Sequence, residues 1–406
     1  MSLTAHRIII TLTTAIVLLI AGIFAIFWAR GFKISPQTGI SRTGLIVANS
    51  VPDGAKVFLD DKLVSATNAT ISFLEPKKYR VKITKDGFTT WEKDIEVQAD
   101  LINEIDALLF PLAPELKPLT LSGASNPQLS PDGQKIAYTS SGAEKGGIWI
   151  NAMSDGPLSF NKGPKNVVKN TTSIDFDKAN ITWSPSSDEI LVQTVNEAPK
   201  YYLFDTSRTS NPLTPISEVI ASETLVDWQD TIRLLQTNLV ANLPDSVRSA
   251  AEQNLETTTP TPTPKTKTSV ANKTESTSSA KLELNYYPFN LKFSPDEEKV
   301  LYKLSENNSF SYRIYDLKLK KELVVGTLDQ ETKVDWFPDS AHLIITSKDG
   351  ISIVETDGNN KQLLFSGDLG KQKTAFPWPD GSKIVIEANF NINNSSQSNL
   401  YTLILR

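Results

Sequence analysis

Four aspartates occupy equivalent places in a repeated turn and are the first candidates for chemistry. They could bind a metal, or act as general acid and base in glycoside hydrolysis, if two or more of them converged. One copy per repeat, however, separates them around a repeated fold, and Asp beside Pro stabilises turns by accepting local backbone N–H groups. We therefore predict that they are structural turn residues: Asp132, Asp296, Asp339 and Asp380.

The remaining residue types offer few routes to catalysis. The chain has no cysteine, which excludes disulfides, thiolate metal sites and cysteine nucleophiles. Its two histidines are His6 and His342, so a Ser-His-Asp triad or a histidine zinc site would have to use His342. The segment 357–360, Asp-Gly-Asn-Asn, lacks the acidic ligand that a calcium loop needs further on, and we predict a hairpin turn there. We assign no catalytic, cofactor-binding or metal-binding residue and expect no cofactor.

The tryptophans could instead stack on sugar rings. They stand beside the repeated strands, where large aromatic side chains more often fill the core. We interpret four of them as core residues: Trp149, Trp183, Trp336 and Trp378.

The repeated turn organises the second part of the chain. In its first copy, Ser130-Pro131-Asp132-Gly133, proline presets φ for the second position of a type I turn. Each copy follows an apolar or aromatic residue and precedes a short β-rich segment and then a second strand. Multi-stranded units of about 40 to 50 residues are typical of a β-propeller, because one such sheet cannot bury its faces alone. The five copies begin at Ser130, Ser184, Ser294, Phe337 and Trp378.

These turns resemble the repeats of TolB-type and WD-related propellers, whose signature also centres on Ser-Pro-Asp-Gly after an aromatic residue. We predict a propeller over residues 119–406 with five or six blades, the sixth around residues 225–228, where the turn is degenerate. We also expect residues 119–121 to complete the last blade beside residues 400–405 and so to close the ring.

Two segments interrupt the repeats. In residues 215–255, Leu225, Trp228 and Ile232 fall at helical spacing, which predicts a helix packed on the side of the propeller rather than a partner-binding helix. Residues 256–280 are almost all Thr, Ser, Pro and Lys, a composition that buries too little apolar surface to fold. We predict a disordered loop there.

The first part of the chain contains an uncharged apolar run at residues 8–29. These 22 residues would span about 33 Å as a helix, enough for a hydrocarbon core of about 30 Å. No small-x-small cleavage site precedes Arg30, which favours a retained single-pass transmembrane helix over a cleaved signal peptide. Flanking positive charges are nearly balanced, but the bulk of the chain follows the run. We expect residues 1–7 to be a short cytoplasmic leader and the rest to be extracytoplasmic.

Residues 43–107 show period-two alternation, which predicts a small antiparallel β-sandwich. Val57, Leu59, Val81 and Trp91 fall on apolar faces of this alternation, and Ile71 and Phe73 pair at period two. Three prolines then make residues 108–118 a semi-rigid connector.

Two motifs in the sandwich resemble the PEGA domain of bacterial surface proteins. They are Pro52-Asp53-Gly54-Ala55, with Asp in place of Glu, and Lys85-Asp86-Gly87-Phe88. The chain departs from the family pattern at residues 66–68, where Thr-Pro is usual, and at residues 77–78, where a glycine is expected; both departures lie in turns. The resemblance implies an extracytoplasmic stalk or surface-binding module with no known catalysis.

The net charge of −5, with Lys and Arg spread along the chain, argues against nucleic-acid binding. We therefore predict an all-β protein with one N-terminal transmembrane helix, located at the cytoplasmic membrane. We expect it to present the axial mouth of its propeller, without catalysis, to an envelope protein or polysaccharide. The alternatives are a propeller hydrolase of surface glycans, which needs converging carboxylates in the channel, and a sensor subunit of an envelope complex.

Overall fold

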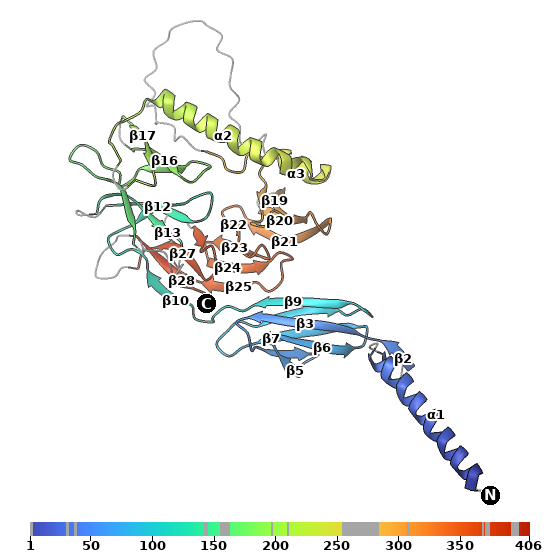
Figure 1. Ribbon diagram of the computed structural model, residues 1–406. Coiled ribbons are helices and arrows are strands. Elements are labelled where there is room, and N and C mark those ends of the chain that lie inside the picture. Colours follow the sequence, from blue (N-terminus) through green and yellow to red (C-terminus); the bar gives the residue numbers. More distant parts are fainter. Residues whose placement is uncertain are drawn as a thin grey trace. The chain divides into compact units, whose positions relative to one another are not determined.

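The computed structural model divides the chain into two compact units, Met1–Ala113 and Pro114–Arg406 (Figure 1). The disordered loop predicted at residues 256–280 lies outside the described residues. The structure describes residues 3–29, 32–35, 39–141, 145–154, 163–195, 198–208, 211–253, 284–306, 309–367, 369, 374–390 and 398–406.

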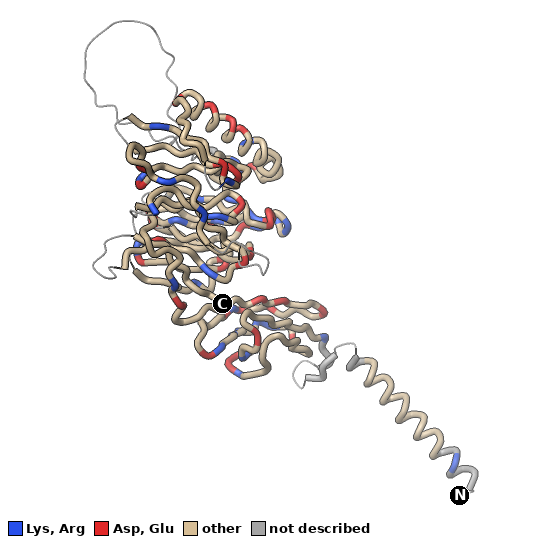
Figure 2. The backbone as a smooth tube through the Cα atoms, turned by 60° about the vertical axis from the view of Figure 1, so that its left-hand side comes forward, with Lys and Arg blue, Asp and Glu red and all other residues tan. Residues whose placement is uncertain are grey.

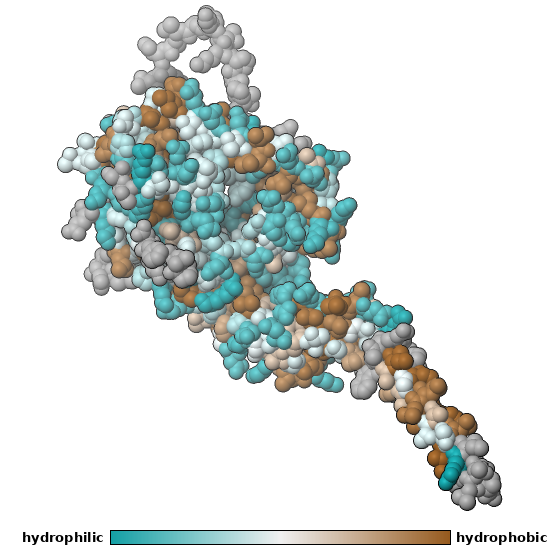
Figure 3. Space-filling view, in the orientation of Figure 1, coloured by the Kyte–Doolittle hydropathy of each residue, from teal (hydrophilic) through white to brown (hydrophobic). Residues whose placement is uncertain are grey.

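The first unit begins with helix α1 (Leu3–Ala29) and a hairpin of β1 (Phe32–Ser35) and β2 (Gly39–Arg42). The side chains of residues 10–26 in α1 are all exposed, and Figure 3 shows most of the helix as hydrophobic. Among the helices of the described residues, none combines the length and the apolar character that crossing a membrane requires. The transmembrane assignment of residues 8–29 therefore stays a prediction.

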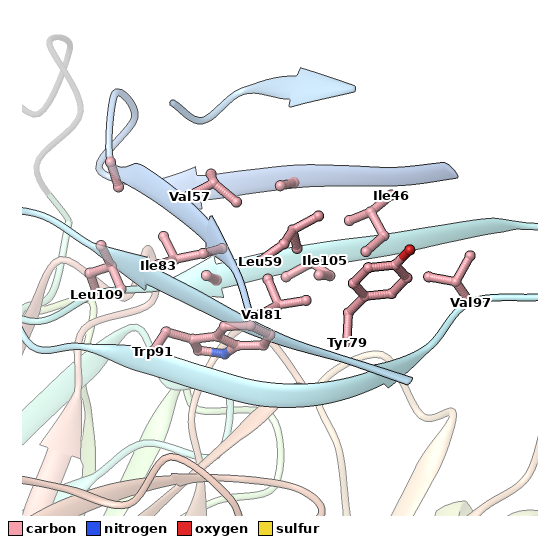
Figure 4. Packing of buried hydrophobic residues seen from close by; sticks show 13 residues of the cluster. Ile46, Val57, Leu59, Tyr79, Val81, Ile83, Trp91, Val97, Ile105 and Leu109 are labelled. Atoms are coloured by element: carbon pink, nitrogen blue, oxygen red, sulfur yellow. The ribbon is translucent and has the colours of Figure 1, made fainter. Parts of the chain in front are cut away.

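The rest of the first unit is a β-sandwich of two sheets. Its core holds the side chains of Val57, Leu59, Val81 and Trp91, as the period-two pattern predicts (Figure 4). One sheet has the order β6-β3-β9 and the other β5-β4-β7-β8. The strands are β3 (Gly44–Val51), β4 (Lys56–Leu59), β5 (Lys62–Ala66), β6 (Ala69–Leu74), β7 (Lys78–Thr84), β8 (Trp91–Glu96) and β9 (Ile102–Leu108).

Two details of the predicted sandwich are wrong. Strand β9 pairs with β3 in parallel, with Leu45 opposite Ile102, so the sandwich is not purely antiparallel. Phe73 does not share a buried face with Ile71, because β6 carries a bulge opposite Leu45. Phe73 has φ +60° and is 42% exposed. The extra residue of a bulge re-aims a side chain, which period-two counting cannot foresee.

The second unit is a β-propeller of five sheets within the described residues. The sixth blade expected around residues 225–228 is wrong, because these residues are helical. We number the blades in chain order. The first has β11 (Ser125–Leu129), β12 (Lys135–Ser140), β13 (Gly147–Ala152) and β14 (Lys165–Lys169); the second β15 (Asn180–Trp183), β16 (Glu189–Gln193) and β17 (Tyr201–Asp205); the third β18 (Lys292–Phe293), β19 (Lys299–Glu306), β20 (Ser309–Asp316) and β21 (Lys321–Asp329). The fourth has β22 (Lys333–Trp336), β23 (His342–Ser347), β24 (Gly350–Glu355) and β25 (Gln362–Phe365), and the fifth β26 (Ala375–Pro377), β27 (Lys383–Ala388), β28 (Asn399–Ile404) and β10 (Glu115–Pro118).

The fifth blade closes the ring with a strand from the start of the unit. Strand β10 pairs with β28 from Glu115 opposite Ile404 to Pro118 opposite Tyr401. The closing strand therefore lies just before residues 119–121, inside the segment predicted to be a connector. Its proline is tolerated because β10 pairs on one side only, and an edge strand can lack one N–H donor.

The five repeated turns have one geometry. In each, the N–H of the fourth residue donates to the carbonyl of the first, at 2.7 to 3.1 Å. The fourth residue has a left-handed backbone with φ between +57° and +70°. This is a type I turn followed by a left-handed residue, a common hairpin connection. The fourth residues are Gly133, Ser187, Glu297, Ser340 and Gly381.

Two serines at this left-handed position connect neighbouring blades. The hydroxyl of Ser187 accepts the N–H of Asp132 from the preceding blade at 3.1 Å, and the hydroxyl of Ser340 accepts the N–H of Asp296 in the same way at 3.1 Å. A left-handed backbone costs a residue with a Cβ about 1–2 kcal/mol. The inter-blade hydrogen bond explains why serine stands where glycine would be less strained.

The helical insertion forms α2 (Glu218–Ala241) and α3 (Asp245–Gln253) (Figure 1). Ala221 and Leu225 of α2 pack on Tyr201 of the second blade. Val247 of α3 packs on Val300 of the third blade. The insertion therefore contacts two neighbouring blades. Figure 2 shows acidic residues along α2.

The left-handed turn position provides a test by substitution. Glu297→Gly should raise the free energy of unfolding by about 0.5–1 kcal/mol, because it relieves the strain without removing a hydrogen bond of the Glu297 side chain. Ser340→Gly relieves the same strain but loses the bond to Asp296, so it should give no such gain. Urea denaturation of both variants measures the difference. Equal stabilisation by the two substitutions would mean that the serine bond contributes nothing.

Candidate binding site at the propeller axis

A cavity of about 800 Å³ lies where the five repeated turns meet. We call it the axial cavity. Every blade contributes its turn proline to the lining, so the cavity opens on the turn-bearing face of the propeller. These prolines are Pro131, Pro185, Pro295, Pro338 and Pro379.

The innermost strands supply the polar and aromatic walls. In four of the five blades the residues one and two places before the turn line the axial cavity, and those two places before are Gln128, Lys292, Asp335 and Phe376. Thr374, four places before its turn, lines it as well. The ends of the innermost strands next to the turns therefore form this part of the lining.

Helix α2 and the segment after the long insertion cover part of this mouth. Ile232, Leu235 and Gln236 of α2 line the axial cavity together with Tyr286 and Tyr287. The side-chain amide of Gln236 donates to the carbonyl of Tyr286 at 3.1 Å, which ties the two segments together. The helix thus packs on the propeller, as predicted, and in addition lines the axial cavity, which the prediction did not include.

One ion pair sets the charge in the axial cavity. The ammonium of Lys292 binds the carboxylate of Asp335, donates to the carbonyl of Val334 at 2.9 Å and lies 5.0 Å from the ring centroid of Tyr287. Burial alone would lower the pKa of Lys292, but the negative charge of Asp335 outweighs it and raises that pKa above its usual value. Desolvation also raises the pKa of Tyr287, although the residue as a whole is 40% exposed. At neutral pH this wall therefore holds a paired ammonium beside an uncharged phenol.

A smaller pocket of about 270 Å³ adjoins the axial cavity and shares Gln128, Leu129 and Tyr286 with it. We call it the amide pocket. It lies between the innermost strands of the first and second blades. Its polar side chains are those of Asn126, Gln128, Asn180 and Thr182.

The four turn aspartates act as predicted, within their own turns. Each carboxylate accepts the backbone N–H two residues further on. The donors are Gln134 at 3.0 Å, Glu298 at 3.0 Å, Ala341 at 2.9 Å and Ser382 at 2.8 Å.

His342 belongs to the turn of the fourth blade. It is 5% exposed, its Nδ1 lies 2.7 Å from a carboxylate oxygen of Asp339, and its ring packs edge-on against Phe337. Burial would raise the pKa of Asp339, but hydrogen bonds from His342 and two backbone N–H groups outweigh it and lower that pKa. Neither His342 nor Asp339 is among the described residues that line the two pockets.

The segment 357–360, which was considered as a calcium loop, forms a turn. The carboxylate of Asp357 accepts the N–H of Asn359 at 3.1 Å in the hairpin that joins β24 to β25, which confirms a turn. In the described ranges no three His, Asp or Glu side chains group as metal ligands.

Three of the four tryptophans are core residues as predicted, namely Trp183, Trp336 and Trp378. The indole N–H of Trp183 donates to the carbonyl of Gln128 at 3.0 Å, and that of Trp336 to Lys292 at 2.9 Å. Each of these bonds reaches the preceding blade. Trp149 is only partly buried.

Residues 43–109 match the family model of the PEGA domain, which confirms the resemblance. The chain is similar to a putative TolB from Agrobacterium tumefaciens (14% identity, TM-score 0.21, covering 68% of this chain and 70% of that one). It is also similar to TolB from Acinetobacter baumannii (14%, 0.22, 80% and 65%) and to an oligogalacturonate lyase in complex with manganese (9%, 0.29, 90% and 97%). A comparison with curated proteins gives no match. The assignment of blades rests on the sheet topology above.

The sequence contained an unused signal for the cavity residues. Counting back two and four places from the first residue of each turn selects ten alternate positions, and all of them except Asn290 and Lys333 line the axial cavity or the amide pocket. At two places these are Gln128, Thr182, Lys292, Asp335 and Phe376, and at four places Asn126, Asn180, Asn290, Lys333 and Thr374.

The Asp339 turn predicts a pH-dependent stability. Hydrogen bonds to a charged group contribute about 1 kcal/mol more than bonds to a neutral one, so Asp339→Asn should lower the free energy of unfolding by about 1–2 kcal/mol at pH 7. The native pKa of Asp339 is depressed, so its contribution is complete above the unfolded pKa of about 3.9 and is lost as the pH falls through the native value. The difference between the two proteins should therefore shrink below about pH 4.

Urea denaturation across the pH range measures this difference. Asp349→Asn, at an exposed carboxylate, is the control and should change stability little at any pH. A loss in Asp339→Asn that persists unchanged in acid would show that the carboxylate charge plays no part.

Proposed function

We propose that this chain is a binding protein of the cell envelope whose axial cavity captures a segment of an envelope protein or polysaccharide. The observation that carries the proposal is the convergence of all five turns on one cavity. Its volume of about 800 Å³ lies in the range of about 300–1,000 Å³ typical of ligand sites. The PEGA match at residues 43–109 supports an extracytoplasmic module in the same chain as the propeller.

The composition of the mouth suits binding to a chain-like ligand. Tyr287 is 40% exposed at the mouth, where Phe293 and Phe376 are partly buried in the wall. Aromatic faces contribute large apolar contact area at low entropic cost, and the prolines around them stiffen the rim. The Lys292–Asp335 pair supplies fixed polar contacts between them.

A non-enzymatic role is favoured over hydrolysis by the state of the carboxylates. Among the described residues of the axial cavity, the acidic ones are Asp132 and Asp335. Asp132 accepts the hydroxyl of Ser130 and a backbone N–H, and Asp335 binds Lys292. Glycoside hydrolysis needs one carboxyl group to protonate the leaving oxygen and a second to attack or activate water. Two carboxylates committed to separate local partners do not provide that arrangement.

The membrane attachment is a second part of the proposal. In this account α1 lies in the cytoplasmic membrane and the residues after it are extracytoplasmic. Support comes from the uncharged run at residues 8–29 and from the exposure of every side chain between residues 10 and 26. Transfer of such apolar surface from water into lipid is favourable by about 25 cal/mol per Å².

Capture at the mouth can be tested with Tyr287→Ala. The full chain, held in detergent on a solid support, is incubated with an extract of the producing cells' envelope. Loss of one aromatic contact of about 0.5–1.5 kcal/mol should lower the retained polymer about 2- to 12-fold. Leu319→Ala, 69% exposed in the turn between β20 and β21, is the control and should leave retention unchanged. Equal retention by both variants would place the site elsewhere.

Membrane attachment can be tested by protease treatment of intact cells followed by carbonate extraction of their membranes. We expect cleavage after Arg30 while the cells stay sealed, with the fragment containing residues 8–29 resisting extraction. Replacing Leu18 and Leu19 by Asp should release the full-length chain, because each charge in hydrocarbon costs about 2.5–3.5 kcal/mol. Full-length wild-type protein dissolved in the lysate would refute the anchor.

A further inference from the structure

The amide pocket differs from the axial cavity in that it is polar without charge. Among the described residues that line it, none is acidic or basic. Its polar groups are three amides and one hydroxyl, those of Asn126, Gln128, Asn180 and Thr182. Trp183 and Tyr286 supply aromatic wall, and the shared residues make the pocket a side branch of the axial cavity.

The hydrogen bonds within the pocket use the amide donors and leave three of the acceptor oxygens. The amide N–H₂ of Asn126 donates to the carbonyl of Ala179 at 2.7 Å, that of Gln128 to Asn126 at 3.2 Å, and that of Asn180 to Gln193 at 3.4 Å. Within the described part of the chain, no partner is found for three oxygens. These are Gln128 Oε1, Asn180 Oδ1 and Thr182 Oγ1.

The three free acceptor oxygens and the lack of charge determine which ligand groups can bind in the amide pocket. Two carbonyl oxygens accept hydrogen bonds and repel a carboxylate or phosphate, whereas the absence of a carboxylate among the lining residues gives an ammonium no counter-charge. A ligand hydroxyl fits, because it can donate to Gln128 or Asn180 and also accept from Thr182. Adjacent hydroxyls on one sugar ring present several such donors within a small volume, whereas a peptide presents one backbone N–H per residue.

The aromatic walls are held in place before any ligand arrives. The hydroxyl of Tyr286 donates to the carbonyl of Trp183, and the indole N–H of Trp183 donates to Gln128. Both polar ends are thus satisfied. Trp183 is buried in the core and fixes the wall from behind, and the partly buried ring of Tyr286 is the apolar surface that a ligand can reach. Rigid walls reduce the ordering cost of binding.

We propose that the amide pocket is the subsite of the axial cavity for one uncharged sugar residue of an envelope glycan. The sugar hydroxyls bond the oxygens of Gln128, Asn180 and Thr182, and the C–H face of the sugar ring lies on the ring of Tyr286. This inference rests on the proposed function, because it assigns the capture site to a polysaccharide rather than to a protein.

The test uses the full chain in detergent and an array of neutral oligosaccharides built from hexose and N-acetylhexosamine units. An uncharged Gly-Ser-Ala decapeptide and an oligogalacturonate are included as other ligand classes. We expect binding to members of the neutral set and none to the other two. Thr182→Val keeps the side-chain shape but removes the hydroxyl, which should weaken binding about 5- to 150-fold.

Two further variants protect the test from a folding defect. Gln128→Met removes a second of the three acceptors with a side chain of similar length and should weaken binding in the same way. Loss of its bond to Asn126 should lower the free energy of unfolding by only about 1 kcal/mol, so the variant should stay folded. Thr356→Val, on the hairpin after β24, makes the same chemical change outside both pockets and should leave affinity unchanged.

Three outcomes would overturn the subsite: no neutral oligosaccharide binds, the decapeptide binds and Thr182→Val weakens it, or Thr182→Val has no effect on glycan binding. In each of these cases, envelope polymer that is retained by wild type and lost in Tyr287→Ala would leave the proposed function standing. Absence of any retained polymer would refute that function itself.

Discussion

The propeller depends on one pairing between segments far apart in the chain. Strand β10 at residues 115–118 completes the blade that ends at residue 404, and no other described strand pairs with that edge of β28. Blades of a propeller bury their faces only against neighbours, so an open ring would leave two faces in water. The same closure brings the five turns around one axis. The axial cavity therefore exists only in the completed ring, and any ligand that contacts several blades adds to the stability of the closed form.

The repeated turn connects this stability to recognition. Its proline and aspartate shape the hairpin, while the left-handed fourth residue lets the chain enter the second strand. Where that residue is serine, its hydroxyl joins one blade to the preceding one, as at Ser187 and Ser340. Two tryptophans reinforce the same pairs of blades through their indole N–H groups. Because the turn prolines also form the rim of the axial cavity, the elements that hold the blades together are the elements that a ligand meets.

Much of this fold could be predicted from the sequence because its signals are local. Five proline turns marked five blades, and period-two alternation marked the buried faces of the sandwich at Val57, Leu59 and Val81. Non-local pairings could not be read in this way. The parallel partner of β3 and the closing role of β10 each depend on a segment far along the chain, and a bulge reversed the expected direction of Phe73. The helix of residues 218–241 was recognisable by its spacing, but its position over the mouth depends on contacts with Tyr286. The cavity residues were predictable in principle, since they stand at fixed distances before each turn.

Those fixed distances have a consequence for how such a protein can diversify. The innermost strands repeat one backbone, yet the residues at their pocket-lining positions range from Asn180 to Asp335 and Phe376. A substitution there changes the groups that a ligand contacts in the axial cavity. The residues of the turns and of the contacts between blades stay the same. Within each repeat, the positions that set ligand affinity are therefore different from the positions that set the fold. A new preference can be installed one blade at a time, without redesign of the ring that displays it.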